Sequence, residues 1–123
     1  MGSFAAAWVN KVHPLTTVVV PSRVNSQFSS GVLFAELLVS LGWLSSAEFG
    51  DSVVSHANCT SHRLINMHVV VAALKTVVME SWDKREVCLF DGEKLVKLVP
   101  LIITEAQGAA AELLLRIKSA TER

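Results

Sequence analysis

The fold is decided by the stretch Phe28-Ser29-Ser30-Gly31-Val32-Leu33-Phe34-Ala35-Glu36-Leu37-Leu38, which opens on small polar residues and continues with closely spaced apolar side chains. Ser29 or Ser30 is suited to cap a helix, because a serine hydroxyl accepts a hydrogen bond from a free amide at the helix start. The apolar positions form a broad face, which is typical of a helix at the centre of a domain. Gly42 is a helix stop signal. The pattern therefore predicts a central helix over residues 31–41.

Helical spacing of apolar residues recurs on both sides of this stretch. Residues 45–48 match the S-x-x-E capping box, which indicates a short helix that ends near Gly50. The other predicted helices cover residues 4–12, 60–78, 91–98 and 104–119, and residues 15–23 are predicted to be an extended connection.

Proline and threonine mark three of the expected helix ends. Pro14 ends the first helix, because the residue before a proline is driven out of the α region. Pro100 is expected to stop the helix that starts near Asp91, and Thr104 is expected to cap the last helix. The total is five or six helices with no strand pairing, so the predicted fold class is an all-α bundle.

Length and composition fit one folded domain. The chain has 123 residues, of which 51% are hydrophobic and 18% are charged, which suits a single domain over residues 1–123 and excludes a disordered chain. Because so small a bundle cannot bury every aliphatic side chain, we expect an exposed apolar patch, and such patches mark interfaces. The run Leu113-Leu114-Leu115 spans more than one helix face, so its helix either is buried on two sides or docks to a partner.

Charge and cysteine content narrow the class of protein. Eleven basic and eleven acidic residues give zero net charge, whereas a nucleic-acid binder needs a basic surface, so no nucleic acid is expected as a partner. Cys59 and Cys88 lie far apart and form no disulfide framework, which favours a reducing cytoplasm. No run reaches the roughly 18 apolar residues of a membrane-spanning helix, and the start lacks the basic region of a signal peptide. We expect a soluble, intracellular protein that does not bind membranes.

No motif for catalysis is present. The sequence contains no G-x-S-x-G, H-E-x-x-H or P-loop string. Cys59 and His62 have a spacing that could place two metal ligands on one helical turn, but a zinc site needs three or four, and only His56 and Asp51 lie near them. His68 lies on an apolar helix face and is interpreted as a packed histidine. We therefore predict no catalytic residue, no metal, no cofactor and no small-molecule substrate, and hence no enzyme.

Four blocks of sequence, in this order, resemble the calponin-homology family and above all its flagellar branch. They are Trp8-Val9-Asn10, the 28–38 stretch, Arg63-Leu64-Ile65-Asn66 and Ile103-Thr104-Glu105-Ala106-Gln107-Gly108-Ala109-Ala110-Ala111-Glu112-Leu113-Leu114. The second is similar to the signature of the family's central helix, and the third to the basic residue, leucine and asparagine that open its third long helix. The resemblance spans residues 8–117. Ser30 departs from the pattern, since an aspartate is common there.

The resemblance implies a compact calponin-homology-like bundle that acts as an adaptor by binding an axonemal or other cytoskeletal protein in a cilium or flagellum. It also implies that the chain is the N-terminal part of a longer protein. Direct binding to microtubules or tubulin through a local basic patch is the alternative, and the zero net charge makes it the second choice. Actin binding is less favoured, because the actin-binding members of the family usually carry two such domains in tandem.

Six residues are candidates for partner binding, namely Lys84, Arg85, Lys94, Lys97, Trp43 and Trp82. Lys94 and Lys97 share a helix face, so they form a modest basic patch with Lys84 and Arg85, and Arg116 and Lys118 could extend it. The attraction of such a patch fades with salt. Trp43 and Trp82 each either cover one end of the core, which we favour, or serve as surface anchors.

Overall fold

The computed structural model describes residues 2–12, 15, 18–54, 59–81 and 92–121. Within these residues the chain is helical and contains no strand, so the predicted all-α fold class is confirmed. The described elements are α1 (Gly2–Val12), the 3-10 turn η1 (Pro21–Arg23), α2 (Val24–Phe28), α3 (Val32–Leu41), α4 (Ser46–Ser52), α5 (Thr60–Ser81), α6 (Gly92–Ile103) and α7 (Ala109–Thr121). The described part thus holds seven α-helices, where five or six were expected.

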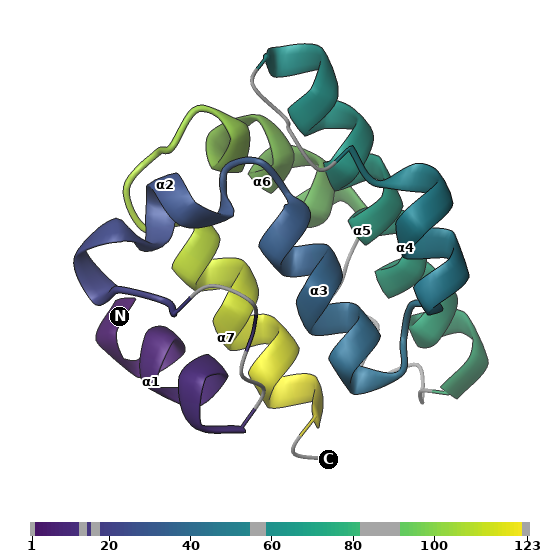
Figure 1. The fold of residues 1–123 in the computed structure, drawn as a ribbon, viewed down its shortest axis with the longest axis horizontal. Coiled ribbons are helices and arrows are strands. Elements are labelled where there is room, and N and C mark those ends of the chain that lie inside the picture. Colours follow the sequence, from purple (N-terminus) through teal and green to yellow (C-terminus); the bar gives the residue numbers. More distant parts are fainter. Residues whose placement is uncertain (1, 13–14, 16–17, 55–58, 82–91, 122–123) are drawn as a thin grey trace.

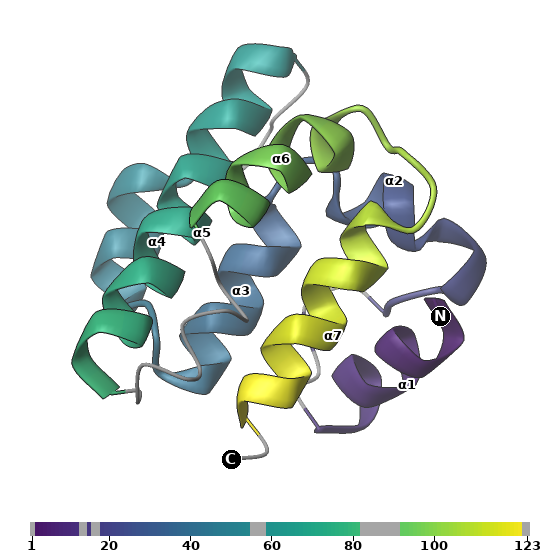
Figure 2. The same ribbon diagram turned by 180° about the vertical axis from the view of Figure 1, so that it is seen from behind.

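The core is built around α7, which lies between α1 and α3 in both views of the molecule (Figures 1 and 2). α7 packs against α1, α2 and α6, and α3 packs against α5. Leu113, Leu114 and Ile117 of α7 are fully buried, while Leu115 is half-buried. The run of three leucines was expected either to be buried on two sides of its helix or to dock to a partner. For Leu113 and Leu114 the first explanation is correct.

The turn from α2 into α3 is built on Gly31. Its φ of 83° lies in the left-handed region, which glycine adopts without strain. A Cβ at this position would lie 2.7 Å from the Cβ of Asn66, so a larger residue would push the turn away from α5. The buried rings of Phe28 and Phe34 flank the turn with their centroids 4.6 Å apart. The predicted central helix is confirmed, and Gly31 is the residue that allows it to approach α5.

Serine capping is confirmed for α4 but not for α3. α3 has Gly31 as its N-cap and no side-chain cap bond. The hydroxyl of Ser29 donates to the carbonyl of Ser26, and that of Ser30 accepts only a 3.3 Å bond from the amide of Val32. At α4 the hydroxyl of Ser45 accepts a 3.1 Å hydrogen bond from the amide of Glu48, as the capping box predicts.

The end of α3 at Gly42 is also as predicted. Gly42 has a φ of 79°, and its amide donates to the carbonyl of Val39 at 3.0 Å. The amide of Trp43 donates to the carbonyl of Leu38 at 2.9 Å, which completes a Schellman motif. This closed end fixes the direction in which the chain leaves α3, and with it the position of Trp43.

Two expected boundaries near the C-terminus are wrong. Pro100 does not stop α6, which continues to Ile103 and ends because Glu105 adopts a left-handed φ of 61°. The amide of Ala106 donates to the carbonyl of Leu101 at 2.8 Å, which closes this helix end. The hydroxyl of Thr104 donates back to the carbonyl of Pro100 at 2.7 Å, so Thr104 belongs to the end of α6 and does not cap α7.

The connection predicted to be extended over residues 15–23 is only partly so, because η1 and then α2 follow Val20. The side chain of Asn10 donates to the carbonyl of Val19 at 2.8 Å and accepts from its amide at 2.9 Å. Gln27 accepts from the amide of Val20 at 2.8 Å and donates to the carbonyl of Val18 at 2.9 Å. The side-chain amides of Asn10 and Gln27 therefore satisfy the backbone groups of this segment. In a sheet, such groups would instead bond to a neighbouring strand.

α5 is the longest described helix and holds the bundle together through two polar side chains. Arg63 donates a 2.8 Å hydrogen bond to the carbonyl of Ile103 at the end of α6. Asn66 is fully buried and bonds to Ser30 before α3 and to Val54 after α4. No described helix is both long and apolar enough to cross a lipid bilayer.

Candidate protein-docking site

The structure describes only some of the residues that were predicted to bind a partner. Trp82, Lys84 and Arg85 lie outside the described residues. Lys94 belongs to α6, but its side chain lies outside the described part of the chain. Lys97 is exposed on α6, and Trp43 is half-buried directly after α3. Of these candidates, Trp43 is the one that the structure places in a groove.

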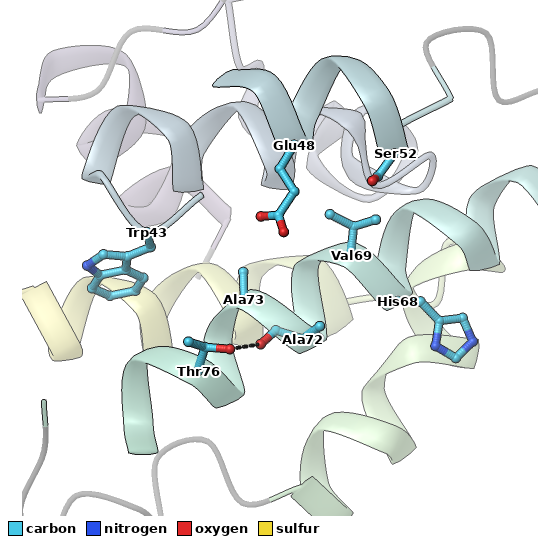
Figure 3. Close-up of a pocket in the computed structure, with 8 residues that line it drawn as sticks. All are labelled: Trp43, Glu48, Ser52, His68, Val69, Ala72, Ala73 and Thr76. Carbon is cyan, nitrogen blue, oxygen red and sulfur yellow. Dashed lines mark hydrogen bonds between the residues drawn. The ribbon is translucent and has the colours of Figure 1, made fainter. Parts of the chain in front are cut away.

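This groove lies between α4 and α5 and has a volume of about 390 Å³ (Figure 3). Trp43 closes one end, and Glu48 and Ser52 come from α4. The α5 side consists of His68, Val69, Ala72, Ala73 and Thr76. Its position follows from the local structure, because the closed end of α3 places Trp43 and the Ser45 cap starts α4 beside α5.

The α5 side of the groove is lined by small residues. Ala72 and Thr76 are exposed and Ala73 is buried, so one turn of α5 presents little more than methyl groups. The hydroxyl of Thr76 donates to the carbonyl of Ala72 at 2.9 Å and is therefore already satisfied (Figure 3). A partner that enters here gains apolar contact and meets no buried polar group on this side.

The charges around this groove are acidic. Glu48 lines it, and Asp51, three residues further along α4, is also exposed. Neither carboxylate forms an ion pair with a residue in the described part of the chain. No lysine or arginine is among the described residues that line the groove, and His68 lies at its edge.

A second, smaller cleft of about 180 Å³ lies between α5 and α6. Its described lining consists of Met67, His68, Val71, Lys75, Val96 and Val99, and the one full charge among these residues is basic. Val96 is 61% exposed, and Leu101 on the same helix is 46% exposed. These two side chains fit the expectation that some apolar surface stays uncovered. Lys75 was not singled out from the sequence, because an isolated lysine in an apolar helix gives no signal of its own.

Residues with catalytic or metal-binding chemistry do not converge in the described structure. Ser52, His68 and Glu48 line the same groove and are the residue types of a catalytic triad, but no hydrogen bond joins them. All three are exposed, and the imidazole of His68 points away from Ser52 (Figure 3). Among the described residues no three histidine, cysteine or acidic side chains are placed to hold a metal ion.

The chain is matched by no protein-family model, by no curated protein and by no solved structure. What the groove binds must therefore be inferred from its shape and charge. Its volume falls in the range of small-ligand pockets, but it is an open trough between two helices. Such a shape suits side chains projected from a second protein better than an enclosed small molecule.

Proposed function

We propose that this chain is a calponin-homology-like protein-interaction domain, which acts as an adaptor in a ciliary, flagellar or other microtubule-linked assembly and catalyses no reaction. The observation that carries this proposal is the groove between α4 and α5, where a half-buried tryptophan stands beside uncovered small apolar residues. Tryptophan is enriched among the residues that dominate binding energy at protein interfaces. Trp43 thus both covers one end of the core and is available as an anchor.

The contact between Gly31 and Asn66 supports the calponin-homology assignment. These two residues lie thirty-five positions apart in the sequence and belong to two separate blocks of the resemblance. In the structure the Nδ2 of Asn66 donates to the carbonyl of Ser30 at 2.8 Å, and Gly31 leaves the space that this contact needs. One contact therefore explains both the glycine of the first block and the asparagine of the second. Two motifs that resembled the family by chance would not need to form such a contact.

Direct binding to the microtubule lattice is the second candidate function, and the cleft between α5 and α6 favours it. The acidic surface of a microtubule would be attracted by Lys75 in this cleft and by Lys97 next to Val96. The zero net charge of the chain keeps this attraction local, so it should fall steeply with added salt.

Co-sedimentation with microtubules, and with filamentous actin in parallel, separates the candidates. Under the adaptor proposal the purified domain stays in the supernatant with both polymers at low and moderate salt. Pelleting with microtubules that is lost in the Lys94→Glu/Lys97→Glu variant would replace the adaptor by a direct lattice binder. Pelleting with actin would overturn both.

The adaptor role itself is tested in ciliated cells that express the tagged domain. We expect the wild-type domain to remain with the axonemal fraction after detergent extraction, and Ala72→Leu to release it by filling the groove. The same substitution at the exposed Ala7 of α1 is the matched control. Retention of Ala72→Leu at the wild-type level would show that the groove is not the docking surface.

A further inference from the structure

We infer that the groove between α4 and α5 binds a basic amphipathic helix of a partner protein. The inference rests on the proposed function as an interaction domain and adds the partner's secondary structure and charge. Three features of the groove carry it: the nature of its walls, the size of its lining residues and the sign of its charges.

The walls favour a helix over an extended peptide. An extended peptide gains affinity by pairing its backbone with a free sheet edge, whereas a helix docks through side chains alone. Both walls of this groove are helices, whose backbone groups bond within the helix. Ala72, Ala73 and Thr76 are small, so the axis of a docked helix can come close to α5.

The uncovered surface of α5, in the groove and beside it, sets the length of the contact. Ile65 lies one turn before Val69 on the same side of α5, and it is 45% exposed. From Ile65 to Thr76 the helix rises by about 17 Å, which corresponds to about three helical turns. A partner helix of this length presents apolar residues at i, i+3 or i+4 and i+7, and one of them meets the ring of Trp43.

The charges select a basic partner. Glu48 of the groove and Asp51 are spaced i, i+3 and therefore project from neighbouring positions on the surface of α4. They form no ion pair with a described residue, and no basic side chain is among the described residues that line the groove. Lysine or arginine on the polar face of the docked helix would complement both carboxylates, whereas an acidic helix would place like charges together. The cleft on the other side of α5, with Lys75, has the opposite charge.

The test uses a displayed library of 18-residue helical peptides with randomised polar and apolar faces. The library is first depleted on the Ala72→Leu domain and then selected on the wild-type domain, so that the retained peptides depend on the groove. We expect the retained pool to be richer in lysine and arginine than the input pool and to repeat apolar residues at the helical spacing. Selection on the Ala7→Leu domain should return the same pool.

Each other outcome rejects a defined part of the inference. A retained pool that is acidic, or unchanged in charge, overturns the basic partner but leaves the groove as a docking site. A pool without helical periodicity overturns the helix. Absence of any peptide that distinguishes wild type from Ala72→Leu overturns the docking site and, with it, the proposed function.

A binding titration of one selected peptide tests the role of the two carboxylates directly. Glu48→Gln with Asp51→Asn should raise the Kd by about threefold to twentyfold at low salt, because each exposed charge pair contributes little and is screened. Glutamine at position 48 keeps the residue type of the capping box, so α4 is retained. The effect should shrink as salt is added, and a salt-independent Kd would overturn the charge assignment.

Discussion

At the scale of single residues, Gly31 is a position where the fold tolerates little change. Gly31→Ala should lower the free energy of unfolding by about 2 kcal/mol or more, because it combines a left-handed φ with a Cβ placed 2.7 Å from that of Asn66. Gly50→Ala is the matched control. It lies inside α4 with nothing within 4 Å of its added Cβ, so it should raise stability by about 0.4–1 kcal/mol. Equal effects in urea unfolding would contradict this account.

Asn66 is the second such residue, because one buried side chain serves three backbone groups. Asn66→Ala leaves the amide and carbonyl of Val54 and the carbonyl of Ser30 without this partner, and should cost about 2–4 kcal/mol. Gln27→Ala also removes two bonds to backbone, but these are exposed and water can replace them. Its cost in the same urea titration should stay below about 1 kcal/mol. A loss as large as that of Asn66→Ala would refute the role of burial.

The sequence allowed Gly31 to be placed at the start of the central helix, but it did not reveal why glycine is needed there. The reason lies in Asn66, which is thirty-five positions away and in a different helix. Nothing in the local pattern states which backbone groups an isolated asparagine will satisfy. The same limit applies to Trp43: it could be named as a candidate, but the groove that it closes exists only once α4 and α5 lie side by side.

At the scale of elements, the end of α6 carries a residue that is poorly suited to its conformation. Glu105 has a φ of 61° without being glycine, so Glu105→Gly should raise the free energy of unfolding by about 0.5–1 kcal/mol. The substitution also removes the contact with Arg63, but this pair is 4.0 Å apart and partly exposed, so its loss offsets little of the gain.

Gln107→Gly in the same turn is the control, since Gln107 has no positive φ and glycine there should only destabilise. Thermal unfolding of both variants decides the point. A lower Tm for Glu105→Gly would mean that the contact with Arg63 outweighs the backbone strain.

Helix prediction succeeded where the apolar spacing was clearly helical, as in α3 and α5, and where a capping box was present, as in α4. It failed for η1 and α2, because three β-branched residues before Pro21 favour an extended chain. It also failed at Thr104, where the hydroxyl had two possible uses and the structure has the bond back to Pro100. A hydroxyl that could cap the start of one helix can equally bond to the last carbonyl groups of the helix before it. Which of the two bonds forms depends on the conformation of the turn that follows.

At the scale of the whole molecule, α7 is the element on which the core depends. Leu114 is fully buried in it, so Leu114→Ala should cost about 2–5 kcal/mol, a large share of the stability of a domain of this size. Its neighbour Leu115 is half-buried, and Leu115→Ala should cost clearly less. Thermal unfolding of the two variants is the measurement, and similar losses would contradict the central position of α7.

The central place of α7 also affects how the protein is made. α1 and α2 pack against α7, yet they leave the ribosome well before it. About 80 residues separate Phe28 from Ala109, and at ordinary rates of translation they take roughly 4–16 s to synthesise. Throughout that interval the nascent chain carries apolar helices whose covering partner does not yet exist. The uncovered apolar faces of newly made molecules therefore favour aggregation until α7 emerges.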